Sequence, residues 1–163
     1  MKVKSVLFVC SANCCRSVIA EALFKEAIAK RGLKDVETFS RGTHAMFGRL
    51  PFAGVIDALK DWKLDVSAHQ ARPLERNDIA RADLILVAED SHLRFIGENF
   101  LKAAKKTFLL KQYAGDAPDP TGYWNVADPM GLTPEACRQC RDDLQKTIEN
   151  LIAKLWPTEG SPK

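Results

Sequence analysis

The chain has 163 residues, the size of a single domain, of which 46% are hydrophobic and 28% charged, so it has enough apolar material for a packed core. This composition excludes a disordered or fibrous protein. Because 24 Lys and Arg oppose 21 Asp and Glu, the net charge of +3 mildly favours anionic ligands and does not indicate a nucleic-acid or membrane-surface protein. No apolar run approaches the ~20 residues of a membrane helix.

The N-terminal residues 1–10 begin like a signal peptide, but their apolar stretch is short and runs into a polar segment without a small-residue cleavage site. We interpret them as a buried strand of a cytoplasmic protein. The cysteines are odd in number and three of them crowd into six positions, which does not suit an ordinary disulfide framework. We therefore expect five reduced thiols with chemical or packing roles: Cys10, Cys14, Cys15, Cys137 and Cys140.

Strand and helix patterns alternate along the chain, which predicts an α/β domain with a mainly parallel sheet. Residues 3–9 are a short apolar run rich in β-branched side chains. Residues 17–30 then carry apolar side chains at helical spacing and are followed by Gly32. Residues 36–39 indicate a second strand, and Pro51 suits the start of a second helix.

The second half of the chain continues this alternation. Residues 74–81 suit a short helix, and residues 84–88 are the clearest buried strand in the sequence. The pair Asp90-Ser91 can cap a helix that runs to residue 99. Residues 107–110 predict a fourth strand.

A long segment, residues 114–130, contains several Pro and Gly residues and two aromatic ones. Ordered loops of this length usually carry function. Thr133 followed by Pro predicts the N-terminus of a long final helix. Cys137 and Cys140 share its apolar stripe, which favours core packing over a zinc or redox site. These patterns predict one domain over residues 1–157 and a flexible C-terminal tail, residues 158–163.

The loop after the first strand has a spacing that suits an oxyanion. Cys10 ends the strand, Arg16 follows six positions later, and Ser17 begins the helix. A loop of this length can wrap its backbone N–H groups around a tetrahedral oxyanion, while the helix N-terminus adds unpaired donors and positive potential. A thiol placed there loses its proton easily, and a guanidinium fits two phosphate oxygens.

This arrangement predicts attack of the Cys10 thiolate on phosphorus, followed by hydrolysis of a phosphocysteine intermediate. The leaving group then needs a proton, and a general acid that a loop places over the site contributes about 10²–10⁴-fold. Residues 114–130 contain two candidates, Asp119 and Asp128, each followed by Pro. The reaction requires neither a metal ion nor an organic cofactor, and we expect none.

The sequence Val-Cys-Ser-Ala-Asn-Cys-Cys-Arg-Ser at 9–17, followed by Ala20-Glu21, resembles the phosphate-binding loop of low-molecular-weight protein-tyrosine phosphatases. A lone Cys-x5-Arg pattern is only moderately specific. The resemblance covers nearly the whole chain, however, and its further blocks occur in the family's order, which makes the signal strong. These blocks are Ser-Arg-Gly-Thr at 40–43, Ser-Ala-His-Gln-Ala-Arg at 67–72, Ala-Asp-Leu-Ile-Leu at 82–86 and Ala-Asp-Pro-Met-Gly at 127–131.

The resemblance implies roles for three residues. Cys10 is the expected nucleophile, Arg16 the clamp for the phosphate and the transition state, and Asp128 the general acid and then base. The family favours Asp128 over Asp119 because its Asp-Pro-x-Gly sequence lies directly before the final helix. The implied fold is a three-layer α/β sandwich with four parallel strands in the order 2-1-3-4, flanked by helices, with the site at the carboxyl end of the first strand.

The resemblance also implies which residues surround the phosphate. The loop residues expected to bind it are Ser11, Ala12, Asn13, Cys14, Cys15 and Ser17. In relatives, an Asn and a Ser of this loop form a network with a later Ser and a later His. The matching positions here are Asn13, Ser17, Ser40 and His69. Such a network holds the phosphate donors in place.

Four positions depart from the family's usual pattern. Val18 stands where the family usually has Pro, and Ala12 stands where it has Gly, so Ala12 fits the turn only with a negative φ. Met130 replaces the aromatic residue that tyrosine-specific relatives tend to place beside the substrate ring. Cys14 matches neither the branched apolar residue of those relatives nor the small polar residue of protein-arginine phosphatases. Phosphotyrosine, phosphoarginine and small phosphoesters all stay open as substrates.

Cys15 matches a second loop cysteine of many relatives, which implies a reversible disulfide with Cys10 that protects the nucleophile from overoxidation. Cys14 is an alternative partner for Cys10. The two remaining histidines away from the family motifs, His44 and His92, are expected at the surface.

Two rival functions also stay open. A thiol-dependent arsenate reductase shares this loop but needs a resolving pair of cysteines near the site, and residues 89–92 after the third strand contain none. A catalytically inactive module that binds phosphoproteins or senses redox state would bind oxyanions without turnover. For the enzyme we expect a monomer that acts on a phosphorylated protein or a small phosphoester, with no nucleic-acid or membrane partner.

Overall fold

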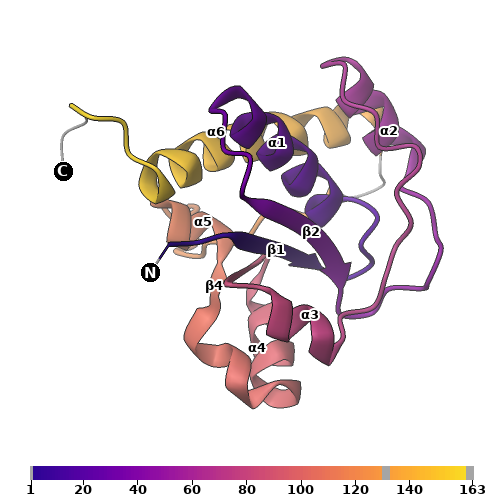
Figure 1. Cartoon of the computed structure of the whole chain (residues 1–163). Helices are drawn as coiled ribbons and strands as arrows, with labels where there is room; N and C mark the ends of the chain where they lie inside the picture. Colours follow the sequence, from indigo (N-terminus) through magenta and orange to yellow (C-terminus); the bar gives the residue numbers. More distant parts are fainter. Residues whose placement is uncertain (1, 130–132, 161–163) are drawn as a thin grey trace.

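A parallel sheet of four strands forms the centre of the computed structural model, which describes residues 2–129 and 133–160 (Figure 1). Every neighbouring pair of strands is parallel, in the order β2-β1-β3-β4. The predicted fold class and strand order are confirmed. The strands are β1 (Ser5–Cys10), β2 (Glu37–Gly42), β3 (Leu84–Val87) and β4 (Thr107–Leu109).

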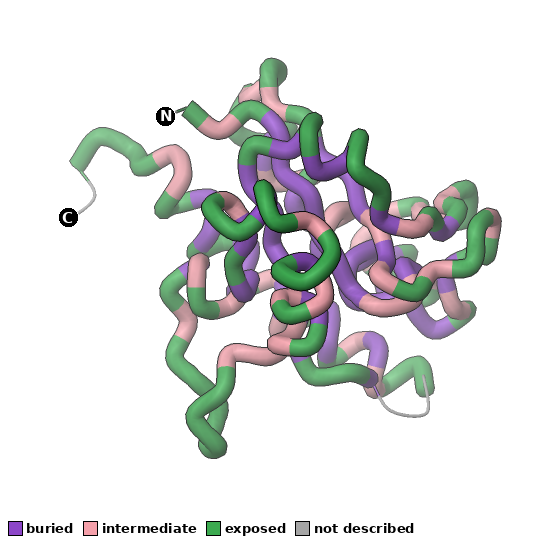
Figure 2. The backbone as a smooth tube through the Cα atoms, turned by 90° about the horizontal axis from the view of Figure 1, so that it is seen from below, coloured by how far each residue is buried: buried purple, intermediate pink, exposed green. Residues whose placement is uncertain are grey.

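Helices cover both faces of this sheet and complete the three layers (Figure 1). The first face is covered by α1 (Arg16–Lys30), α2 (Ala53–Lys60), α5 (Leu110–Ala114) and α6 (Pro134–Leu155). The second face is covered by α3 (Arg76–Arg81), α4 (Asp90–Asn99) and the 3₁₀ helix η1 (Leu101–Lys106). Figure 2 shows the buried backbone gathered in the middle of the molecule, with exposed segments around it.

Alternation along β1 sorts its side chains between two cores. Val6 and Phe8 pack with α1 and α6, whereas Leu7 and Val9 pack against α3 and α4. Cys10 continues the first set, so its side chain lies on the α1 side, at the carboxyl end of the strand. The same side of the sheet receives the N-terminus of α1, which brings a helix end to the nucleophile candidate.

The cysteines of α6 lie in the core, as predicted. Cys137 and Cys140 are buried in the same cluster as the apolar stripe of the helix. After α6, Trp156 packs against Phe24 with ring centroids 6.2 Å apart, and its carbonyl accepts a hydrogen bond from Arg31. Residues 161–163, half of the expected tail, lie outside the described ranges.

Several element ends differ from the predictions. The helix expected from Pro51 begins at Ala53, and the one expected over residues 74–81 begins at Arg76. Leu110 belongs to α5 instead of β4. The Asp90-Ser91 cap is wrong, because the residue before this pair caps α4 through a capping box.

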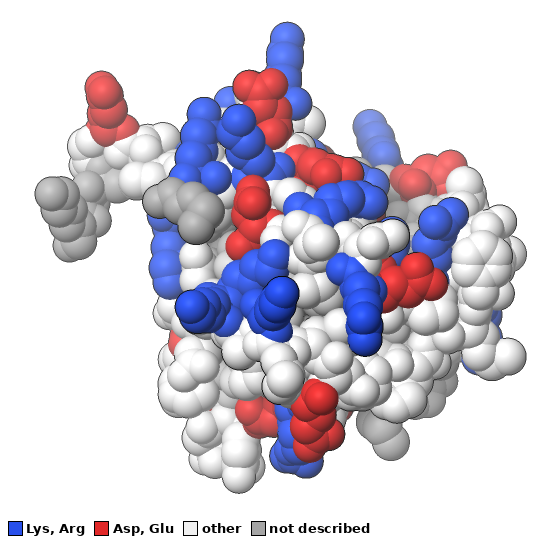
Figure 3. All heavy atoms as spheres, turned by 60° about the horizontal axis from the view of Figure 1, so that its bottom comes forward, with Lys and Arg blue, Asp and Glu red and all other residues white. Residues whose placement is uncertain are grey.

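Charges of both signs are interspersed on the face that Figure 3 shows, in keeping with the small net charge. Within the described ranges, no helix is both long and apolar enough to cross a membrane. The same ranges contain no group of three or more His, Cys, Asp or Glu side chains that could hold a metal ion.

Candidate active site

The loop of residues 10–16, called here the 10–16 loop, joins β1 to α1 and is held from outside through its carbonyls. The backbone N–H groups of Thr43 and His44 donate to the carbonyls of Cys10 and Ser11, both at 2.9 Å. No acceptor in the described part of the chain pairs with the backbone N–H groups of residues 11–16. A row of unpaired N–H groups at a helix N-terminus is the arrangement that binds a tetrahedral oxyanion.

The turn of this loop depends on Asn13 and Gly42. Asn13 has a φ of 56°, a left-handed conformation that Asn tolerates better than most residues, whereas Ala12 is not among the residues with a positive φ. Gly42 in β2 lies behind the turn, where a Cβ would stand 2.5 Å from the carbonyl oxygen of Ser11 and 3.0 Å from the backbone nitrogen of Asn13. Only glycine leaves the loop this room.

A hydrogen-bond network centred on Asn13 supports the loop. The Asn13 side-chain nitrogen donates to the hydroxyls of Ser17 and Ser40, both at 2.9 Å, and its oxygen accepts from the backbone N–H of Arg72 at 3.0 Å. The amide is buried, so these bonds fix its orientation. Ser17 also lies 2.9 Å from the Cys10 sulfur, so it can donate to a Cys10 thiolate.

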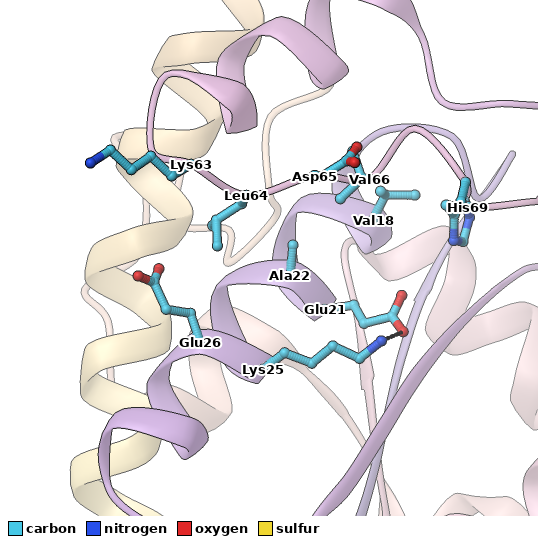
Figure 4. A pocket seen from close by; sticks show the side chains of 11 residues that line it. Val18, Glu21, Ala22, Lys25, Glu26, Lys63, Leu64, Asp65, Val66 and His69 are labelled. Carbon is cyan, nitrogen blue, oxygen red and sulfur yellow. Dashed lines mark ion pairs between the residues drawn. The ribbon is translucent and has the colours of Figure 1, made fainter.

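The same network reaches a groove behind the loop, shown in Figure 4. His69 donates through Nε2 to the Asn13 carbonyl at 3.0 Å, and Ser40 donates to Glu21 at 2.8 Å. His69 and Glu21 lie at one end of the groove, with Lys63 and Glu26 toward the other (Figure 4). The structure thus brings together Asn13, Ser17, Ser40 and His69, the four positions that the resemblance selected.

Arg16 is the only arginine of the 10–16 loop, and it is held at the site by α4. Its side chain is 6% exposed, and its Nη1 donates to Glu89 at 2.8 Å and to the Val126 carbonyl at 3.1 Å. Burial lowers the pKa of Arg16, but the Glu89 hydrogen bond and the nearby Cys10, Glu89 and Asp128 charges outweigh it and raise the pKa. Arg16 therefore stays charged between the thiol and the two carboxylates.

The two acid candidates have different surroundings. The Asp119 carboxylate is exposed and accepts from the hydroxyl of Thr121 and from the backbone N–H groups of Thr121 and Tyr123; these bonds lower its pKa. Asp128 is exposed and lies close enough to Arg16 to raise the pKa of that guanidinium. Asp128 is therefore electrostatically linked to the loop, whereas the carboxylate of Asp119 bonds within its own turn. Met130, the expected substrate contact, lies outside the described ranges.

The other two loop thiols are buried. Burial raises the pKa of Cys14, although Arg49 opposes this shift. A hydrogen bond with Cys140, followed by burial, raises the pKa of Cys15 far above its usual range. Cys15 thus lies against a thiol of α6, 125 positions later in the chain, which sequence spacing does not indicate.

His92 and Glu89 are site residues that the sequence reasoning missed. The expectation that His92 lies at the surface is wrong, since it is 2% exposed. Its Nε2 lies 2.8 Å from the Ser11 hydroxyl, and its Nδ1 accepts the Glu89 backbone N–H at 3.2 Å. The available signal was a capping box with His at its last position, which is harder to notice than the usual Glu or Gln. His44, by contrast, is exposed as expected.

This fold and loop define a class of proteins, and sequence comparison identifies it. The model of the family described as low molecular weight phosphotyrosine protein phosphatase matches residues 5–159. The chain therefore belongs to this family.

Individual relatives include proteins with two different named activities. A protein-arginine-phosphatase of Bacillus subtilis is 31% identical over 150 residues, covering 92% of this chain and 95% of the relative. A low molecular weight phosphotyrosine protein phosphatase of Sus scrofa is 33% identical over 152 residues, covering 88% and 95%. Among solved structures, a Cys-to-Ser mutant of the YwlE arginine phosphatase with a phosphorylated active-site serine has a TM-score of 0.84 at 30% identity, covering 95% of this chain and 97% of that one.

Proposed function

We propose that this member of the family hydrolyses phosphomonoesters of proteins through a phosphocysteine formed on Cys10. The observation that carries the proposal is the 10–16 loop, which surrounds the Cys10 thiol with unpaired N–H groups and a buried, charged Arg16. A related arginine phosphatase that carries a phosphorylated active-site serine in place of its cysteine supports a phosphoenzyme intermediate.

In the first step the Cys10 thiolate attacks phosphorus, and the bond from phosphorus to the leaving atom breaks; this atom is the oxygen of a phosphoester or the guanidine nitrogen of phosphoarginine. Asp128 donates its proton to the leaving atom. The backbone N–H groups and the Arg16 guanidinium bind the equatorial oxygens, whose charge grows in the transition state. The Ser17 hydroxyl can donate a hydrogen bond to the attacking sulfur.

In the second step the Asp128 carboxylate accepts a proton from water. The oxygen of this water attacks phosphorus, the bond from phosphorus to sulfur breaks, and phosphate leaves with the Cys10 thiolate restored. The same carboxyl group thus acts first as an acid and then as a base. Both steps use only groups of this chain and water.

We propose phosphotyrosine as the preferred substrate, with phosphoarginine as the alternative. The match to the phosphotyrosine family favours the first, while the relative named protein-arginine-phosphatase favours the second. Cys14 differs from the usual residue of both kinds, and Met130 differs from the aromatic residue of tyrosine-specific relatives, so these positions do not assign the substrate. Comparing kcat/KM for matched phosphotyrosine and phosphoarginine peptides assigns the substrate. Equal and very low values for both would contradict a protein substrate and leave a small phosphoester.

We further propose that the enzyme works in the cytoplasm as a monomer and that peroxide inactivates it reversibly through a disulfide between Cys10 and Cys15, or between Cys10 and Cys14. Recovery of activity with dithiothreitol in the wild type, and its loss in Cys15→Ser or Cys14→Ser, identifies the partner thiol. Irreversible inactivation of wild type and variants alike would contradict this protection. Light scattering after size-exclusion chromatography tests the monomer.

The decisive experiment is hydrolysis of para-nitrophenyl phosphate from acid to neutral pH by fully reduced protein, with and without vanadate. We expect vanadate-sensitive turnover in the wild type and none in Cys10→Ser. Vanadate binding without turnover in the wild type would instead favour the inactive phosphoprotein-binding or redox-sensing module. Oxidation of a thioredoxin system that depends on arsenate would favour the arsenate reductase.

A further inference from the structure

We propose that His92 is a positioning residue for the proposed phosphatase reaction, which it serves by holding Ser11, the first residue of the 10–16 loop after the nucleophile. His92 belongs to α4, 82 positions after Cys10, and is buried 2.8 Å from the Ser11 hydroxyl. None of the family blocks in the sequence includes it. The inference rests on the function proposed above, and its test is designed to separate the two.

The hydrogen bonds of His92 fix its tautomer. Its Nδ1 accepts the backbone N–H of Glu89 at 3.2 Å, so this nitrogen carries no proton. The proton of the neutral ring is therefore on Nε2, which donates to the Ser11 oxygen at 2.8 Å. Both ring nitrogens are satisfied, which is the condition for burying an imidazole at low cost.

The charged and titratable groups around His92 favour this neutral form. Burial is the main cause that lowers its pKa to about 4; the Arg16 and His44 side chains add to this shift, and Glu89 opposes it. The imidazole therefore keeps the same proton arrangement at neutral and mildly acidic pH, where a phosphatase would work. Its donation to Ser11 is constant over that range.

The two halves of the 10–16 loop are held by different parts of the fold. The Asn13 side chain holds the second half through Ser17 and Ser40. In the first half, Ala12 has no polar side chain, and the Ser11 hydroxyl pairs with His92 alone among the described residues. His92 thus does for the first half what Asn13 does for the second.

The N-terminal turn of α4 consequently contacts the loop at both ends. Its N-cap residue, Glu89, binds Arg16 at 2.8 Å, and its third residue, His92, binds Ser11. The two residues also close the capping box of the helix, so each one positions the other. This geometry fixes the distance between the backbone N–H groups near Ser11 and the Arg16 guanidinium, the two sets of donors proposed to bind the phosphate. A shift of about 1 Å in such a site can reduce the rate about a hundredfold.

The test compares variants that separate helix capping from the contact with Ser11. In His92→Asn, the side-chain oxygen can still accept the Glu89 N–H, but the side chain is too short to reach Ser11. In His92→Gln, the amide nitrogen can reach the position of Nε2. Ser11→Ala removes the contact and leaves the capping box intact. Asn99→Ala, which removes a side-chain bond at the other end of α4, is the matched control.

For turnover of para-nitrophenyl phosphate we expect Ser11→Ala and His92→Asn to lower kcat/KM and vanadate affinity by a similar factor, about tenfold to a hundredfold. Thermal unfolding of His92→Asn should stay near that of the wild type. His92→Gln should recover most of the loss, and the Ser11→Ala/His92→Asn double variant should lose no more than Ser11→Ala alone. This non-additivity would not arise if His92 acted only on the fold.

Unchanged kcat/KM and vanadate affinity in Ser11→Ala, or losses that simply add in the double variant, would overturn the proposal. If His92→Asn fails to fold, Ser11→Ala still decides, since His92 is intact in that variant. If the wild type shows no turnover, the proposed function fails, but vanadate affinity measured by calorimetry still compares the same variants. The two failures are therefore distinguishable.

Discussion

The 10–16 loop and the segment of residues 115–129, here the 115–129 segment, supply opposite halves of the proposed chemistry and are built in opposite ways. In the loop, residues 13–16 are buried, and side chains from β2, α4 and the segment before α3 bond to it. In the 115–129 segment, residues 117–123 are all exposed. The thiol and the guanidinium are thus fixed before substrate arrives, whereas the acid lies on exposed backbone.

The 115–129 segment is nevertheless anchored near both ends. Thr147 of α6 donates to Asp116 at 2.6 Å, and the Trp124 indole donates to the Asp116 carbonyl at 2.9 Å. The Val126 N–H donates to Ala88 at 2.7 Å, next to the Arg16 contact. Oxyanion binding needs many donors aimed at one point, but a proton donor needs only one group within reach. The two regions differ because these tasks differ.

The largest effect should come from the acid itself, because one carboxyl group carries that half of the chemistry. We expect Asp128→Ala to lower kcat about 10²–10⁴-fold with unactivated phosphoesters, and less with leaving groups that need no proton. Asp119→Ala is the matched control, because the Asp119 carboxylate accepts hydrogen bonds from the backbone of its own turn. Steady-state kinetics measure kcat for both variants. A larger loss of kcat in Asp119→Ala than in Asp128→Ala would assign the general acid to Asp119 instead.

A smaller loss of activity should follow when a side chain added at Gly42 displaces the 10–16 loop. The Cβ of Gly42→Ala would lie 2.5 Å from the Ser11 carbonyl oxygen, so the loop backbone has to move. We expect a loss of about a hundredfold in vanadate affinity and in kcat/KM. Gly97→Ala in α4 is the control, since its Cβ meets nothing within 4 Å. Equal vanadate affinity and kcat/KM in the two variants would show that the 10–16 loop adapts to the added methyl group and is not rigid.

The loop should also make stability depend on pH through His92. Its pKa is about 4 in the folded protein and about 6.5 in the unfolded chain, so the unfolded state binds more protons between these values. Stability is therefore highest above pH 6.5 and falls as the pH drops toward 4. Of this fall, His92 should contribute about 2 kcal/mol by pH 5.

Urea unfolding of the wild type and His92→Gln at pH 7 and pH 5 measures this contribution. The variant should lose less stability than the wild type over that interval, because its amide does not titrate. Identical losses would assign the pH dependence to other groups, among them Glu89, whose pKa is lowered despite burial by bonds from Ser91 and Arg16.

The smallest effect on activity should come from the ion pair between Glu89 and Arg16. Glu89→Gln keeps a hydrogen-bond acceptor but removes the charge, and we expect kcat/KM to fall about tenfold as Arg16 loses its fixed orientation. The i,i+4 pair of Glu26 with the exposed Lys30 provides a control, since surface pairs contribute little, and Glu26→Gln should leave activity unchanged. An unchanged kcat/KM in Glu89→Gln would show that the hydrogen bond to the Val126 carbonyl is enough to orient Arg16.

Much of the site was predictable because its signals are local. Cys10, Arg16 and Ser17 lie within eight positions on a strand, a turn and a helix, so their spacing alone places a thiol and a guanidinium around one oxyanion. Asn13 and Ser17 are four residues apart and bond directly. Element interiors followed from periodicity, whereas several ends shifted by one or two residues. For α3 and α4, capping boxes that begin at Glu75 and Glu89 decide where the helix starts.

Which carboxylate lies near the guanidinium was a question for the tertiary structure. Asp119 and Asp128 have the same local Asp-Pro sequence, and before the structure only the family resemblance favoured Asp128. In the structure, the Asp119 carboxylate bonds within its own turn, whereas Asp128 interacts electrostatically with Arg16. The contact of Cys15, at the start of α1, with Cys140 of α6 likewise could not be predicted, because no pattern in the sequence indicates that these two residues meet.

The sequence by itself determined the fold class, the strand order through its resemblance, and the 10–16 loop, because periodicity, turn chemistry and motif spacing act over a few residues. The tertiary structure alone decided that His92 of α4 and its N-cap residue Glu89 hold the two ends of that loop. The capping-box pattern at positions 89–92 indicates a helix start but not this role. The role depends on β3 lying beside β1 in the sheet, so that the chain leaving β3 enters α4 beside the loop that leaves β1.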